Sequence, residues 1–106
     1  MVIATQVNIG RYGIIDLRVS SNDELEIVVE VKVAAPESEK QLQMYRDWLR
    51  TRAAAKGFLF SLVRHPAQDF PCQKYGVTRK TWRQLYEYLR HLTGKMTWEE
   101  DSTRLG

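Results

Sequence analysis

Three consecutive segments near the start of the chain show the period of two that is typical of β-strands. Residues 2–9 alternate, and Ile3 and Val7 fall on the side expected to face a core. Residues 14–19 form a second segment after a glycine-containing turn, and residues 25–33 form a third that is rich in β-branched side chains. The three segments predict strands joined by tight turns.

The next part of the chain changes to the period of an α-helix. A helix is expected from Pro36 and Ser38 to about Ala55, with Gly57 ending it in the C′ position. Its apolar stripe consists of Leu42, Tyr45, Trp48 and Leu49. The apolar run 58–63 then predicts a short, buried fourth strand.

The last periodic segment predicts a second helix after a loop at residues 64–76. Thr78 is expected to cap this helix and Gly94 to stop it. Its predicted apolar stripe is Trp82, Leu85, Tyr86 and Leu89. The order β-β-β-α-β-α predicts an α/β domain with a mixed four-stranded sheet over residues 1–93, followed by a tail at 94–106, disordered or truncated.

The bulk composition limits the classes of protein that fit. A chain of 106 residues with 43% hydrophobic content holds one core. It has no run of about 18 apolar residues and no secretory signal, and its single cysteine, Cys72, excludes an internal disulfide. These features predict a reduced, cytoplasmic protein that does not cross a membrane.

The charge of the chain is unevenly distributed. Residues 1–39 hold three basic and seven acidic side chains, a net charge of −4, whereas residues 40–95 hold twelve basic and three acidic side chains, a net charge of +9. An acidic part joined to a basic part suits a metal-dependent enzyme that acts on a polyanion, because carboxylates bind the cation and basic groups bind phosphates. A solvated basic surface is the alternative.

The second and third predicted strands place three charged side chains together. A turn near Asn22 brings Asp16 opposite Glu30 to within one residue, and Lys32 projects from the same face as Glu30. Two neighbouring carboxylates repel one another, and a hard cation such as Mg²⁺ or Mn²⁺ relieves that repulsion. This cluster predicts a divalent-metal site, with Lys32 next to the phosphate.

The motif order Ile15-Asp16-Leu17, Glu30-Val31-Lys32 and Gln41-Leu42-Gln43-Met44-Tyr45 resembles the PD-(D/E)XK nuclease superfamily, especially its RecB-like branch. The resemblance covers about residues 5–63 and implies a restriction-endonuclease-like core. It implies metal ligation by Asp16, Glu30 and the Val31 carbonyl, and catalysis by Lys32. Gln41 and Tyr45 would position the site or the nucleic acid.

The chain departs from that family in one important respect. The helix that usually precedes the first strand is missing, so either the chain is a fragment, or the last helix or a partner subunit is expected to cover one sheet face. The implied function is Mg²⁺-dependent phosphodiesterase activity on DNA, in repair, restriction or mobile-element biology. The alternative is a non-catalytic nuclease-like module that binds nucleic acid or a partner protein, also compatible with a homodimer.

Each candidate residue also has a structural interpretation. Asp16 could form an ordinary ion pair with Arg18 or Lys32, and Ser38-x-x-Gln41 fits a helix capping box. Tyr45 lies on an apolar stripe and could belong to the core. The candidate nucleic-acid-binding residues are Tyr45, Arg46, Arg50, Arg79, Lys80 and Arg83, although basic helix residues are often only a solvated face.

Overall fold

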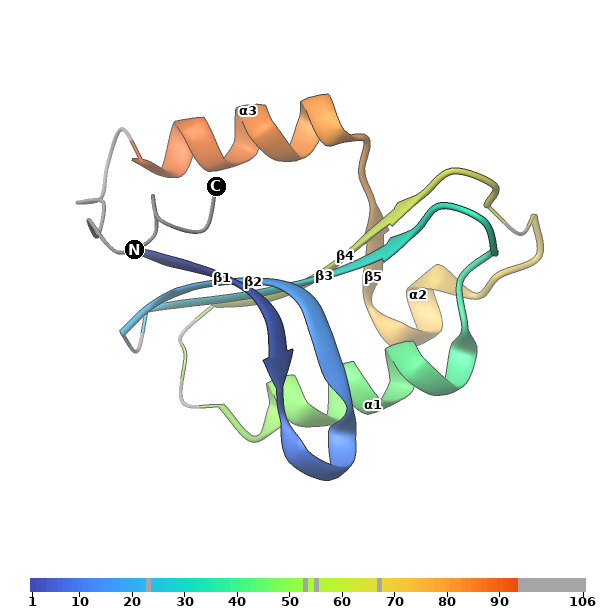
Figure 1. Ribbon diagram of the computed structural model, residues 1–106, viewed down its shortest axis with the longest axis horizontal. Coiled ribbons are helices and arrows are strands. Elements are labelled where there is room, and N and C mark those ends of the chain that lie inside the picture. Colours follow the sequence, from blue (N-terminus) through green and yellow to red (C-terminus); the bar gives the residue numbers. More distant parts are fainter. Residues whose placement is uncertain (23, 53, 55, 67, 94–106) are drawn as a thin grey trace.

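The computed structural model describes residues 1–22, 24–52, 54, 56–66 and 68–93, so the predicted tail at 94–106 lies outside the described residues. In the described part, one sheet carries helices on both faces (Figure 1). The strands are β1 (Val2–Asn8), β2 (Ile14–Ser21), β3 (Leu25–Lys32), β4 (Lys56–Val63) and β5 (Val77–Arg79). The helices are α1 (Glu39–Arg50), α2 (Cys72–Tyr75) and α3 (Trp82–Thr93), and a 3-10 turn, η1 (Gly10–Tyr12), joins the first two strands.

The sheet is mixed, as predicted, and its strands lie in chain order from β1 to β5. The β1–β2 and β2–β3 pairs are antiparallel, and α1 connects β3 to a parallel β4. The prediction of four strands is wrong, because β5 adds a fifth strand parallel to β4, with Val77 opposite Leu59. A strand of three residues is too short to produce a readable alternation, so the sequence pattern missed it.

The first long helix begins where the sequence predicted and ends earlier. Ser38 caps it, since its side chain accepts a hydrogen bond from the backbone of Gln41, but the helix ends at Arg50 rather than near Ala55. Gly57 does not end the helix; it lies in β4, paired with Glu26 of β3. Long-range pairing with β3 therefore overrides the local helix propensity of this segment.

Two apolar clusters fill the space between the sheet and its helices. The α1-side cluster confirms the predicted stripe of α1 and consists of Ile15, Val28, Leu42, Tyr45, Trp48, Leu49, Leu59, Tyr75 and Val77. The α3-side cluster consists of Met1, Val19, Leu25, Ile27, Val29, Phe60, Leu62 and Leu85, with Tyr88, Leu89 and Leu92 packed against it. Of the two coverings expected for this face, the last helix and a partner subunit, the structure shows the last helix, α3.

The last helix is rotated relative to the predicted stripe. Leu85 and Leu89 face the sheet as expected, whereas Trp82 and Tyr86 are each 62% exposed. Thr81 caps the helix instead of Thr78, which lies in β5. The Thr81 hydroxyl accepts from the backbone N–H of Gln84 at 3.1 Å, and the Gln84 side chain accepts from the Thr81 N–H at 2.9 Å. This Thr-x-x-Gln capping box was readable in the sequence.

The predicted loop at residues 64–76 contains the short helix α2, which ends at Gly76 in the left-handed conformation with φ of 63°. Among the described residues, no helix has the length and apolar character needed to cross a membrane.

Candidate functional site

The site begins at the point where β2 separates from β3. The β2–β3 ladder ends with Leu17 paired to Val29, so Asp16 is the next residue toward Glu30 and the two are not paired as backbone partners. Ile15 belongs to the α1-side cluster and Leu17 packs against the α3-side cluster, although residues two apart normally share a face. β2 therefore twists at Asp16.

The same twist is visible in β1. Gln6, which would lie opposite Asp16, has φ of 52°, and the β1–β2 register omits this position. Ile3 packs on the α3 side and Val7 on the α1 side, so the prediction that they share one face is wrong. The positive φ interrupts the alternation of the strand.

The twist directs the Asp16 carboxylate at the open edge of β3. Its Oδ2 accepts a hydrogen bond from the backbone N–H of Val31 at 2.9 Å. The N–H and C=O of one strand residue point to the same side, so the Val31 carbonyl also faces this edge, where β2 no longer supplies a donor. The structure thus brings Asp16 and the Val31 backbone together.

Glu30 lies next to Asp16 on the α1 side of the sheet and is only 2% exposed. Its Oε1 is 3.7 Å from the Lys32 amine, and its Oε2 is buried without a hydrogen-bond partner among the described residues. Burial and, secondarily, the Asp16 charge raise the pKa of Glu30 to about 7, although the Lys32 charge opposes this shift. This carboxylate has an unsatisfied oxygen, which is rare in a buried group.

Gln41 and Tyr45 fix α1 against β2 beside these carboxylates. The Tyr45 hydroxyl donates to the Ile14 carbonyl at 2.6 Å and accepts from Nε2 of Gln41 at 3.1 Å. Its single proton is directed at the Ile14 carbonyl, and its interaction with the adjacent Glu30 lowers the pKa of that carboxyl. Burial and, secondarily, the Glu30 charge raise the pKa of Tyr45 well above its ordinary value.

The expected nucleic-acid contact by Tyr45 is wrong, because its side chain is completely buried. Gln41 was expected either to cap the helix or to position the site, and the structure shows contacts of both kinds. Its backbone completes the Ser38 cap at 3.3 Å, and its side-chain amide turns to Tyr45. Both residues position the site from within the core.

Two of the predicted phosphate-binding arginines are held by the protein itself. Arg46 donates from Nε to the Tyr75 carbonyl at 2.8 Å and from Nη2 to the Gly76 carbonyl at 2.7 Å. Arg79 forms a bidentate pair with the buried Glu37, at 2.6 Å from Nε and 3.2 Å from Nη2. These contacts give both guanidinium groups a structural role in anchoring α2 and β5.

The other predicted basic residues are dispersed. Arg50 lies at the end of α1 opposite Gln41 and pairs with Asp47 at 3.4 Å, and Arg83 of α3 lies 3.8 Å from Glu87. The amine of Lys80 lies over the rings of Phe60 and Tyr88, at 5.3 and 5.7 Å from their centroids. The structure does not gather these three cations next to the carboxylates.

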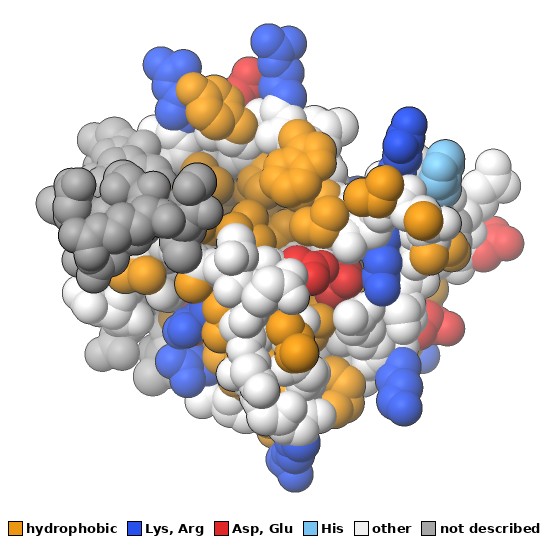
Figure 2. Space-filling view, viewed as in Figure 1, with side chains coloured by type: hydrophobic (Ala, Val, Ile, Leu, Met, Phe, Trp, Pro, Cys, Tyr) orange, Lys and Arg blue, Asp and Glu red, His pale blue; other side chains and the backbone are white. Residues whose placement is uncertain are grey.

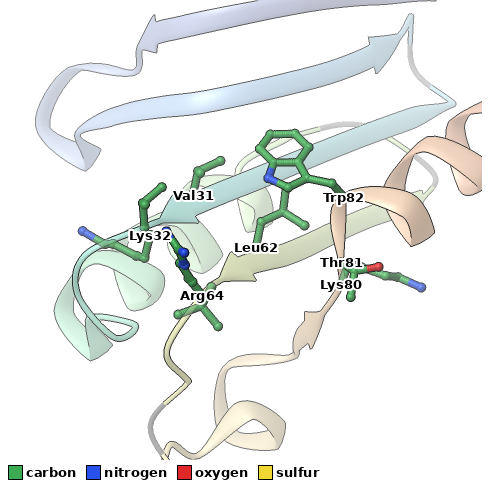
Figure 3. A pocket seen from close by; sticks show the side chains of 9 residues that line it. Val31, Lys32, Leu62, Arg64, Lys80, Thr81 and Trp82 are labelled. Carbon is green, nitrogen blue, oxygen red and sulfur yellow. The ribbon is translucent and has the colours of Figure 1, made fainter.

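A pocket of about 430 Å³ lies on the α3 side of the sheet, and Lys32, which contacts Glu30, is one of the residues that line it. Lys32 and Arg64 lie at one end of it and Trp82 at the other, with Val31 and Leu62 between them (Figure 3). In Figure 2, a hydrophobic patch between α3 and the sheet borders acidic and basic side chains on the visible face.

Sequence reasoning missed Arg64 and Trp82. The signal for Arg64 was its position directly after β4, since Lys32 pairs with Val63 and the ends of parallel strands meet at one edge. The helical period places Trp82 on the apolar stripe of α3, and the docking of this helix on the sheet exposes it instead.

Within the described residues, no group of three or more His, Cys, Asp or Glu side chains is arranged to hold a metal ion. The cluster provides two carboxylates, Asp16 and Glu30, and the Val31 backbone lies beside Asp16. Comparison of the chain with models of protein families, with curated proteins and with solved structures finds no match.

Proposed function

We propose that the chain is a divalent-metal-dependent nuclease that hydrolyses DNA phosphodiester bonds, with Asp16 and Glu30 as metal ligands and Lys32 as the catalytic cation. The proposal includes the PD-(D/E)XK resemblance and its restriction-endonuclease-like core. The observation that carries it is the buried Oε2 of Glu30, which has no partner among the described residues although it lies beside a second carboxylate. Two adjacent acidic groups with an unused oxygen are an arrangement that a cation stabilises.

The residues present fit Mg²⁺ or Mn²⁺ better than a softer metal. Asp16, Glu30 and the Val31 carbonyl supply only oxygen ligands, which hard cations prefer, and an incomplete protein shell leaves positions for water and a phosphate oxygen. A bound dication supplies Lewis-acid polarisation of the phosphate and a coordinated water of lowered pKa.

The protein's own groups determine how a phosphate approaches. Glu30 is held by burial, and Asp16 is oriented by the Val31 N–H, so neither carboxylate needs to reorganise. Lys32 is about a quarter exposed at the same edge, where its amine can reach both Glu30 and an incoming phosphate. Such a preoriented ammonium stabilises the negative charge that develops at phosphorus.

The basic residues Lys32 and Arg64 support a polyanionic substrate, because they lie together at the end of the adjoining pocket. Arg50 and Arg83 are exposed and could add general attraction to DNA, but only through long-range electrostatics.

The test combines metal binding with cleavage. A calorimetric Mn²⁺ titration is expected to give a binding heat for the wild type that Asp16→Asn abolishes. In a plasmid-nicking assay with Mg²⁺ or Mn²⁺, Lys32→Met should lower the rate about 10²- to 10³-fold, by analogy with the loss of one charge-stabilising donor.

Glu30→Gln removes the second proposed metal ligand from the same assays, and Glu26→Gln is its matched control. Glu26 is equally buried on the same face of β3, but it pairs with Arg18 and Arg52 and not with the site. Full activity in Asp16→Asn would identify a contaminating nuclease and refute the proposal. Binding of DNA without cleavage in either metal would support the non-catalytic module instead.

A further inference from the structure

The pocket beside Lys32 has the shape of a slot with a flat aromatic wall. Its floor is the α3-side surface of β3 and β4 at Val31 and Leu62, and the indole of Trp82 extends over that floor from the first turn of α3 (Figure 3). Its volume of about 430 Å³ lies within the usual range of ligand sites.

Trp82 is exposed to an extent that packing alone does not explain. It is 62% exposed, and no described residue accepts a hydrogen bond from its indole N–H. Tyr86, one turn later, is equally exposed but does not line the pocket. Of these two exposed aromatic residues, Trp82 is therefore the one that can cover a ligand in the slot.

The two cations lie at the end of the slot away from the indole. No carboxylate of the described chain pairs with Arg64, so its guanidinium is available to an anion. Lys32 contacts Glu30 at 3.7 Å and also lines the slot. Lys80 also lines the slot, and its amine lies over the rings of Phe60 and Tyr88.

An apolar floor, an exposed indole and two cations at one end are complementary to a flat base joined to a phosphate. Bases in the interior of a duplex have both faces stacked on their neighbours, so an unpaired base presents a face to Trp82 more readily. We propose that this slot binds one nucleotide of a single-stranded DNA segment, with the base on Trp82 and the phosphate between Arg64 and Lys32. The inference rests on the proposed function, because Lys32 both lines the slot and contacts Glu30 of the carboxylate pair.

The test measures binding of a fluorescein-labelled oligo(dT) by anisotropy in EDTA, where no cleavage occurs. Trp82→Leu is expected to weaken binding about 5- to 150-fold, the effect of losing one stacked base, while Tyr86→Leu leaves it unchanged. A blunt duplex of the same sequence should bind more weakly than the single strand and should not respond to Trp82→Leu.

Arg64→Met provides a second readout that a purely structural role would not change. Loss of one phosphate contact to a single strand should reduce the slope of log K against log salt concentration by about 0.7. Arg11→Met, which changes an exposed arginine of η1 that does not line the slot, is the matched control. Far-UV circular dichroism establishes that each variant is folded.

Three results would overturn the slot: no binding of oligo(dT) by the wild type, equal losses in Trp82→Leu and Tyr86→Leu, or an unchanged salt slope in Arg64→Met. These outcomes are separate from a failure of the proposed function. A chain that binds oligo(dT) through Trp82 but cleaves nothing would keep the slot and refute the nuclease. If cleavage depends on Asp16 but Trp82→Leu binds oligo(dT) normally, the nuclease proposal stands and the slot is refuted.

Discussion

The unusual environment of Glu30 leads to a prediction about folding stability that does not depend on any ligand. Glu30→Gln retains the shape of the side chain and removes its charge. Burial, with the neighbouring Asp16 charge, raises the pKa of Glu30 from 4.5 to about 7 in the folded protein. The folded state therefore binds this proton more tightly than the unfolded chain does.

The sign of the pH dependence follows from that difference. Stabilisation by the protonated carboxyl is complete below about pH 4.5 and is lost as the pH rises to about 7. Each pKa unit corresponds to about 1.4 kcal/mol, so the free energy of unfolding of the wild type should fall by up to about 3 kcal/mol relative to Glu30→Gln over this range. For a domain of this size, that difference is roughly 10–20 °C in Tm.

The assay is thermal and urea denaturation followed by far-UV circular dichroism, from pH 4.5 to 8.5, without divalent metals. The two proteins should be similar at pH 4.5, and Glu30→Gln should be clearly more stable at pH 8. Glu26→Gln is the contrasting control, because it leaves Arg18 and Arg52 without their buried partner and should destabilise the protein at neutral pH. A stability difference between wild type and Glu30→Gln that does not change with pH would refute the reasoning.

The remaining predictions concern the contacts that anchor α2 and β5. Arg79→Met removes the bidentate partner of the buried Glu37 and should lower the free energy of unfolding by about 3 kcal/mol in urea titrations, whereas an exposed ion pair would give less than about 1 kcal/mol. Gly76→Ala introduces a Cβ 2.9 Å from Nη2 of Arg46 at φ of +63°. The Arg46 guanidinium must then shift and weaken its bonds to the Tyr75 and Gly76 carbonyls, so the cost should be at least about 2 kcal/mol, compared with about 1 kcal/mol for Gly10→Ala, where φ is +68° but the space is open. Equal melting temperatures for the two glycine variants would contradict the steric explanation.

Part of the candidate site follows from short-range sequence patterns. The alternation of β3 places Glu30 and Lys32 on one face, and the hairpin length brings Asp16 to within one position of Glu30. The helical stripe of α1 and the Ser38 cap are likewise local features. Each depends on the spacing of residues within one or two adjacent segments, which is why the sequence determined them.

Tertiary structure decided the features that depend on contacts between distant segments. The start of β4 at Lys56 is set by its pairing with Leu25, and this pairing, not helix propensity, limits α1. The twist that aims Asp16 at Val31 arises where β2 separates from β3.

The docking of α3 is decided in the same way. The rotation of this helix about its axis exposes Trp82 and creates the slot beside Arg64. The sequence by itself determined which residues could share a face of one strand or helix, because periodicity is a local property of the chain. Only the packed sheet decided which carboxylate oxygen lost its partner and which aromatic ring faces solvent, because both depend on how separate elements meet.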